Sequence, residues 1–333
     1  MTSTNSCLNN PFLLQPAAKD YLWGGNRLND DFSKQIDMSP LAETWECSTH
    51  EDGLSIVASG KHKGVYLKEL LKKYPEYLGI HIKTKSELPI LIKFIDAQKD
   101  LSVQVHPSDI YAKMYENGKS GKTEMWYVMD AVKDAKLIYG LHHTTDKEIL
   151  RQSIENGTVE NYLQQVPVKK DDVFYIEAGT IHAIGAGTLI VEIQQNSNLT
   201  YRLYDYNRID KNGNMRELHV DKALAVANLN SSTEPRQPLR VLRYRQGCAS
   251  ELLCRCKYFE VYRLLVNTER YRNLVRYQTD NTSFHVLLCI EGCGAIRYGN
   301  EIINFFKGDC LFVPANSVEL RIHGKAQFLD VHS

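Results

Sequence analysis

The sequence lacks the features that mark several specialised classes of protein. None of its eight cysteines forms a Cys-x-x-Cys pair, so the usual signatures of zinc ribbons and thiol redox sites are missing. No stretch approaches the roughly 18 consecutive apolar residues of a membrane-spanning helix. Its 40 basic and 40 acidic residues cancel, so no overall field attracts nucleic acid or an anionic membrane. We therefore expect no membrane span and no nucleic-acid partner, and any bound anion must be held by a local site.

The composition is that of an ordinary globular chain. Its 333 residues are 43% hydrophobic and 24% charged, which is enough apolar content for one or two full-sized cores. The N-terminal residues carry neither the basic region nor the apolar run of a secretory signal, so we expect a cytoplasmic location. In that reducing compartment the cysteines, including those of Cys254-Arg255-Cys256, are expected to be small buried hydrophobic residues.

Short β-branched and aromatic runs, separated by turn-forming residues, dominate the chain. They are not regularly separated by helices, so the pattern predicts an all-β fold. The expected strands include residues 88–95, 102–105, 125–129, 173–176, 188–193, 286–290 and 310–313. Helical insertions are expected over residues 67–73, directly after Pro107-Ser108-Asp109, over 147–155 behind a capping box that begins at Thr145, and over 218–227.

A polar, turn-forming segment over residues 228–238 is the best candidate for a linker. It divides the chain into a larger domain, residues 1–235, which carries the helical insertions, and a smaller domain, residues 236–333. Residues 170–182 and 307–319 share a Lys-x-Asp start, an apolar strand and an alanine after it, which suggests two related barrels. The first copy ends in His182 and the second in Glu319, so only the first barrel is expected to bind metal.

Four side chains of the first barrel form a candidate donor set. Gln104 and His106 lie two apart on a predicted strand and therefore project from the same face. Glu124 opens the next apolar run, and His182 follows the strand that ends at Ile176. If these strands pair within one barrel, the four converge on its interior as ligands suited to zinc or another borderline divalent ion. Spacing alone also allows a hydrogen-bonded strand histidine, an exposed Glu124 and a turn residue at His182.

Three basic residues near these positions form a second element. Lys93 lies within an apolar run, where an unpaired charge would be costly to bury, although an ion pair or an extended side chain reaching solvent would also explain it. Lys122 lies two residues before Glu124 and would share its face, unless it belongs to a flexible loop. Arg202 stands among aromatic and polar residues and suits bidentate capture of a phosphate or carboxylate. The alternative for Arg202 is a surface pair with Asp205.

Five segments in order resemble the type I mannose-6-phosphate isomerases, and the resemblance runs from about Leu14 to His219, with a weaker cupin-like match to the C-terminus. The segments are residues 88–97, the Gln104-Val105-His106-Pro107 core, Lys122-Thr123-Glu124-Met125, residues 179–183 and residues 196–202. The resemblance implies two cupin (jelly-roll) barrels, of which the first binds metal and the second is degenerate.

The same resemblance implies one Zn²⁺ per chain with Gln104, His106, Glu124 and His182 as ligands. It also implies Lys93, Lys122 and Arg202 as active-site basic residues, and it places Trp23 and Glu43 in segments that line the substrate pocket. The implied reaction interconverts mannose 6-phosphate and fructose 6-phosphate by proton transfer through a cis-enediol. Longer members have a histidine just before the lysine of the Lys-x-Glu motif, where this chain has Gly121.

Two other functions are compatible with the residues. Two histidines and a carboxylate can form an open iron site, so a cupin iron oxygenase is one alternative, although Gln104 and the basic residues argue against it. A sugar-phosphate-binding cupin without turnover is the other. The sequence leaves open which group is the general base, the native metal, the oligomeric state and how strictly the sugar is selected.

Overall fold

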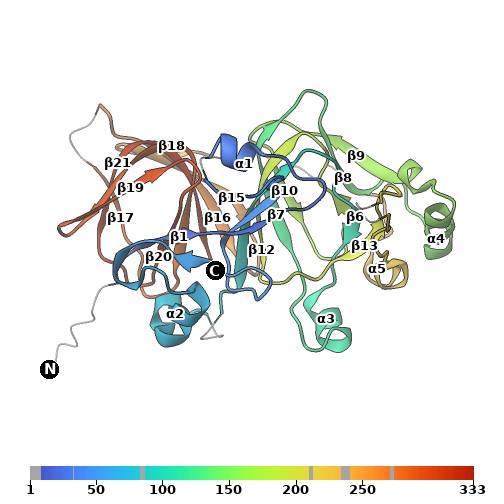
Figure 1. Ribbon diagram of the computed structural model, residues 1–333, viewed down its shortest axis with the longest axis horizontal. Helices are drawn as coiled ribbons and strands as arrows, with labels where there is room; N and C mark the ends of the chain where they lie inside the picture. The colour runs from blue at the N-terminus through green and yellow to red at the C-terminus, as the bar shows by residue number, and fades with distance from the viewer. Residues whose placement is uncertain (1–8, 33, 83–86, 210–212, 234–240, 271–273) are drawn as a thin grey trace.

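The protein consists of two β-rich lobes, as the computed structural model shows (Figure 1). The structure describes residues 9–32, 34–82, 87–209, 213–233, 241–270 and 274–333. The sheets are antiparallel throughout, which confirms the predicted all-β class. The predicted linker, residues 228–238, lies partly outside the described residues. No helix among the described residues is both long and apolar enough to cross a bilayer.

The first lobe pairs a six-stranded sheet with a five-stranded sheet. The six-stranded sheet has the order β10 (Val173–Ile176), β7 (Glu124–Ala131), β12 (Thr188–Gln195), β5 (Ile90–Ala97), β3 (Glu43–Cys47) and β2 (Ala17–Lys19). The five-stranded sheet has the order β13 (Tyr201–Tyr204), β6 (Val103–Val105), β11 (His182–Ala183), β8 (Lys136–Leu141) and β9 (Leu163–Pro167). An apolar cluster with Trp126, Phe174 and Ile190 fills the space between them, so the two sheets form the first barrel.

The second lobe is a ten-stranded sheet with its own apolar cluster, which includes Leu287, Phe305 and Phe328. Its main path runs β14 (Arg243–Arg245), β15 (Cys248–Arg255), β16 (Glu260–Asn267), β21 (Leu320–His332), β18 (His285–Tyr298), β20 (Cys310–Val313), β1 (Phe12–Gln15) and β4 (Ile56–Val57). Strand β17 (Val275–Tyr277) joins β21, and β19 (Glu301–Phe306) joins β18. Because β1 and β4 belong to this sheet, a boundary at residue 235 does not separate the strands of the two lobes.

Helices lie outside the barrels, as the sequence predicts. They are α1 (Arg27–Asp30), α2 (Leu67–Lys73), α3 (Asp109–Tyr115), α4 (Lys147–Glu155) and α5 (Val220–Val226), with short 3₁₀ turns at Gly60–His62, Pro75–Leu78 and Val159–Asn161. The capping prediction was wrong by one residue, because the Asp146 side chain, not Thr145, accepts from the Ile149 N–H. Helices α4 and α5 cover the outer face of the five-stranded sheet through a third apolar cluster.

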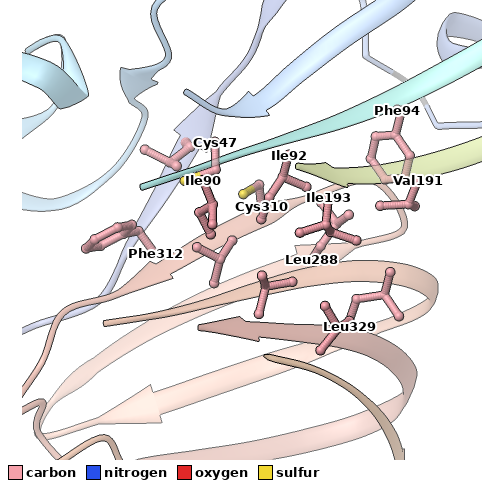
Figure 2. Packing of buried hydrophobic residues seen from close by; sticks show 14 of the residues in the cluster. Cys47, Ile90, Ile92, Phe94, Val191, Ile193, Leu288, Cys310, Phe312 and Leu329 are labelled. Carbon is pink, nitrogen blue, oxygen red and sulfur yellow. The ribbon is translucent and has the colours of Figure 1, made fainter. Parts of the chain in front are cut away.

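Alternation along each strand decides which residues face the second lobe. In β12, Val191 and Ile193 belong to the large apolar cluster between the lobes, so the intervening Glu192 points to the opposite face of the sheet. Figure 2 shows this cluster, with side chains of β5 and β12 facing those of β18, β20 and β21: Ile90, Ile92, Phe94, Val191, Ile193, Leu288, Cys310, Phe312 and Leu329. The polar faces of β5 and β12 are thereby directed into the first barrel.

Most described cysteines behave as predicted, as small residues of the core. Buried thiols are those of Cys47, Cys248, Cys254, Cys289 and Cys310, and none of the described cysteines forms a disulfide. Cys256 is half-buried, whereas Cys293 is exposed and departs from the prediction. Burial raises the pKa of the Cys254 thiol to about 12, which keeps it protonated and unreactive.

Leu288 tests whether the cluster between the lobes stabilises the fold. Leu288 is fully buried there. We expect Leu288→Ala to lower the free energy of unfolding by about 2–5 kcal/mol, because it leaves a cavity in a packed core. Urea denaturation measures this, with Ile302→Ala as control, since Ile302 is 64% exposed and its change should stay within about 0.5 kcal/mol. Equal effects of the two substitutions would contradict this view of the cluster.

Candidate metal centre and substrate pocket

Strand pairing in the first barrel brings together donors that are far apart in the sequence. Glu124 is the first residue of β7 and His182 the first of β11. Gln104 of β6 pairs with His182 on one side and with Arg202 of β13 on the other. His106 follows directly after β6 and projects from the same strand face as Gln104. The two sheets therefore bring these residues together at one end of the barrel.

His106, Glu124 and His182 form a buried cluster. One ligand atom from each lies within 4.8 Å of the other two. The His106 Nε2 atom is 3.1 Å from Glu124 Oε1, and the His182 Nε2 atom is 3.8 Å from Glu124 Oε2. All three residues are at most 1% exposed. Three of the four predicted ligands are thus close enough together to share one ion.

The protonation states of the two histidines favour the binding of a cation. Nδ1 of His182 donates to the Thr180 carbonyl oxygen over 2.8 Å, which fixes the tautomer and leaves Nε2 as the acceptor. That Nε2 is buried and has no hydrogen-bond partner among the described residues. Burial, reinforced by the Lys122 charge, lowers the pKa of His106 to about 3, and burial also lowers that of His182. Two neutral imidazoles and a carboxylate are the donor set of a zinc-type ion.

Glu124 stays ionised although it is fully buried. Burial alone would raise its pKa, but the Lys122 charge, together with the contact to the His106 ring, outweighs that effect and holds the pKa well below its usual range. Lys122 Nζ lies 2.5 Å from Glu124 Oε1 and 3.3 Å from His106 Nε2. Trp126 Nε1 donates to Glu124 Oε2 over 3.1 Å. The carboxylate is therefore ready to bind a metal without losing a proton.

A polar cavity of about 290 Å³ adjoins the cluster. Its wall includes every other residue that the sequence singles out: Trp23, Glu43, Lys93, Gln104, Lys122 and Arg202. Gln104, the fourth expected ligand, is half-buried at the border of this cavity. The cavity therefore joins the donor cluster to three basic side chains.

Lys93 is fully buried and paired, which supports the ion-pair interpretation. Its Nζ lies 3.1 Å from Glu192 Oε1 and 3.9 Å from Glu43 Oε2. Burial would lower the lysine pKa, but the charges of Glu192 and Glu43 reverse the effect and raise it. Lys93 therefore carries a fixed positive charge on the cavity wall.

Arg202 does not pair with Asp205, so that alternative was wrong. Asp205 instead accepts from Arg216 at 2.6 Å and from Arg208. Arg202 Nε donates to Ser102 Oγ over 3.2 Å, and a terminal nitrogen donates to the Glu217 carbonyl over 2.7 Å. Among the described residues no carboxylate forms an ion pair with Arg202. Burial and nearby Arg216 lower its pKa. Because no described carboxylate pairs with it, its charge is available to an anion in the cavity.

Sequence reasoning missed Glu192. Its carboxylate accepts from Trp126 Nε1 over 3.1 Å, and the same N–H reaches Glu124. Burial and the Glu124 charge raise the pKa of Glu192. The signal was present in the sequence as a single carboxylate inside the apolar run of residues 189–193.

Gly121 cannot carry the side chain that longer members of the resembling family have there. A Cβ on Gly121 would lie 2.4 Å from the Asp109 nitrogen and 2.7 Å from the Pro107 carbonyl oxygen. The Gly121 N–H donates to Asp109 Oδ1 over 2.9 Å. Close packing against the start of α3 therefore requires glycine, and position 121 contributes no side chain to the cavity.

Comparison with known families and proteins agrees with this site. Residues 12–134 match the family described as "Phosphomannose isomerase type I, catalytic domain", and residues 250–333 match "Mannose-6-phosphate isomerase, cupin domain". The second match, with the observed β topology, confirms the cupin fold. The first match spans the strands that supply Gln104, His106 and Glu124.

Similarity extends over nearly the whole chain. A mannose-6-phosphate isomerase of Bacillus subtilis is 38% identical over 97% of this chain and 98% of its own length. A mannose-6-phosphate isomerase of Streptococcus mutans is 36% identical over the same shares of the two chains. The crystal structure of a mannose 6-phosphate isomerase from Bacillus subtilis has a TM-score of 0.89 at 34% identity, covering 98% of this chain and 100% of that one. The chain therefore belongs to the type I phosphomannose isomerase family of enzymes.

Proposed function

We propose that the protein interconverts mannose 6-phosphate and fructose 6-phosphate, with Zn²⁺ bound at His106, Glu124 and His182 and with Gln104 as the fourth ligand. The observation that carries the proposal is the buried His-Glu-His cluster, which Lys122 connects to a cavity lined by Lys93, Lys122 and Arg202. In an aldose–ketose isomerase, a Lewis acid beside the sugar oxygens can stabilise the developing negative charge, and nearby cations can hold an anionic substrate. The family relationship supports the same reaction.

Bound zinc would stabilise the negative charge that develops on the sugar oxygens as a proton moves between C1 and C2 through a cis-enediol. Arg202 is placed to bind the phosphate or another anionic part of the substrate, because its planar fork is free of carboxylate partners among the described residues. Ser102 and the Glu217 carbonyl hold the guanidinium in position. Trp23 and Glu43 form part of the cavity wall.

Of the two lysines considered for proton transfer, Lys122 fits better. The two carboxylates beside Lys93 raise its pKa and stabilise its charged form, which makes it a poor proton acceptor. We therefore assign Lys93 the role of a fixed charge on the wall. Lys122 stands between the cavity and the cluster, within hydrogen-bonding distance of His106 and Glu124, and is our candidate for moving the proton.

Some finer points stay predictions. The family relationship favours isomerisation over the iron oxygenase and over binding without turnover, and oxygen consumption with iron but not zinc would instead favour the oxygenase. A cytoplasmic location is also a proposal. So is the division of the chain into two domains near residue 235, in which the N-terminal part contributes β1 and β4 to the second lobe.

Removal of the metal should abolish turnover. We expect chelation to lower isomerase activity by at least ~100-fold, because Lewis-acid stabilisation is worth several kcal/mol, and Zn²⁺ add-back should restore it. A coupled assay on mannose 6-phosphate, together with elemental analysis of the same samples, measures both quantities. Full activity in verified metal-free protein would rule out zinc dependence.

Two substitutions should separate metal binding from substrate binding. His182→Ala should lose the bound metal and the activity together. Arg202→Ala should keep the metal and lower kcat/KM by about 10–100-fold, since a hydrogen bond to a charged group is worth about 1.5–3 kcal/mol.

Metal content and steady-state kinetics check the pair. Arg276→Ala is the matched control, because its side chain is 74% exposed in the second lobe and should leave both quantities unchanged. Loss of metal in Arg202→Ala, or wild-type kinetics in that variant, would contradict the role of Arg202.

A further inference from the structure

We propose that the second barrel carries its own metal site, formed by His285, Asp330 and His332, which binds a borderline divalent ion such as Zn²⁺. This site would be additional to the centre in the first barrel and does not depend on the reaction proposed above. It also departs from the sequence-based expectation that only the first barrel has metal ligands, which rested on Glu319 at the position matching His182.

Strand register places His285 where the first barrel has Glu124. In the first barrel, Glu124 is paired with Ile176 of β10. In the second, His285 is paired with Val313 of β20. Because residues 170–182 and 307–319 are the two copies of the sequence repeat, Ile176 and Val313 are equivalent residues. His285 therefore occupies the position of a residue in the first barrel's donor cluster.

The neighbouring strand shows the same correspondence. Glu192 of β12 is paired with Trp126, two residues after Glu124. Asp330 of β21 is paired with Leu287, two residues after His285. Asp330 therefore stands where the first barrel has the buried carboxylate of Glu192, and a polar group has been kept at this end of both barrels.

The three side chains are close enough to share an ion. One ligand atom of each lies within 4.8 Å of the other two. His285 Nδ1 is 2.7 Å from Asp330 Oδ1, and the rings of His285 and His332, which are paired across β18 and β21, lie 4.3 Å apart. The Nδ1 atom of His332 is buried and has no hydrogen-bond partner among the described residues. Two imidazoles and a carboxylate suit zinc, cobalt, nickel or ferrous iron.

Surrounding groups are of the kind that orient metal ligands. The Tyr277 hydroxyl lies 2.8 Å from His285 Nδ1 and 2.9 Å from Asp330 Oδ2. Glu260 Oε2 lies 3.8 Å from His332 Nε2 and also pairs with Arg255. The side chains of His285 and His332 are each 22% exposed, so an ion can reach them from solvent. An ion here would tie β21, near the C-terminus of the chain, to β18.

Metal stoichiometry of the full-length protein tests the proposal. Chelator-treated protein is dialysed against Zn²⁺ and its metal content measured for the wild type, His182→Ala, His332→Ala and the double variant. We expect two ions, one, one and none. Asp330→Asn, which preserves the side-chain shape, should match His332→Ala and guards against a folding defect. Both second-barrel variants should retain isomerase activity, because neither residue lies at the first centre.

Thermal unfolding of His182→Ala gives a second readout. With the first centre disabled, added Zn²⁺ should raise its unfolding midpoint, because an ion that binds only the folded chain stabilises it. This rise should be absent in the double variant. A wild-type content of one ion, an unchanged content in both His332→Ala and Asp330→Asn, or no rise in the midpoint of His182→Ala would overturn the second site. None of these results would bear on zinc at His106, Glu124 and His182.

Discussion

A fully buried carboxylate, Glu124, is the constraint around which the first barrel is organised. Removing an ion of this kind from water costs several kcal/mol, so it persists only where cations and donors surround it. Lys122 supplies the cation and the Trp126 indole a donor, and the His106 ring lies beside the carboxylate. A divalent ion bound between His106, Glu124 and His182 would meet the same need more fully, since all three donors already have the protonation states that a metal requires.

A chain of charged and hydrogen-bonded side chains links Glu124 to residues of β5 and β12. The Trp126 N–H is shared between Glu124 and Glu192, and Glu192 in turn pairs with Lys93. A charge change at one carboxylate is therefore felt at the other and at the cavity wall. On the opposite face of the same strands, apolar side chains pack against the second barrel (Figure 2). This packing fixes the positions of β5 and β12 and therefore of the charged side chains on their other face. The second barrel thus supports the site by packing, whether or not it binds an ion itself.

Local pattern in the sequence was enough to predict much of the fold, and it included His106, Glu124 and His182, which the structure brings into one buried cluster, in a candidate donor set. The bounds of the α2 and α4 helices, for example, agree with the expected ranges. These predictions succeed because alternation and helix periodicity are properties of short segments. The confirmed family relationship accounts for the grouping of Lys93, Lys122 and Arg202 around one cavity.

What the sequence did not reveal depends on contacts between distant segments. The pairing of β1 with β20 sends an N-terminal strand into the second lobe, and nothing within residues 12–15 indicates that partner. Glu192 was overlooked because its apolar neighbours marked a core strand, and only the pairing with Lys93 shows why a carboxylate is tolerated there. Asp205 likewise pairs with Arg216, and no rule based on spacing along the sequence predicts that Arg216 lies next to it.

Anomalous X-ray diffraction at the zinc edge from crystals of the zinc-loaded protein tests the central claim most directly. The account predicts a strong anomalous peak within about 2.0–2.2 Å of His106 Nε2, His182 Nε2 and a Glu124 oxygen, the usual zinc–ligand distances. The account would be contradicted by a zinc-loaded crystal that shows no anomalous peak among these three side chains. It would also be contradicted if the peak marked a zinc ion bound by other residues of the first barrel.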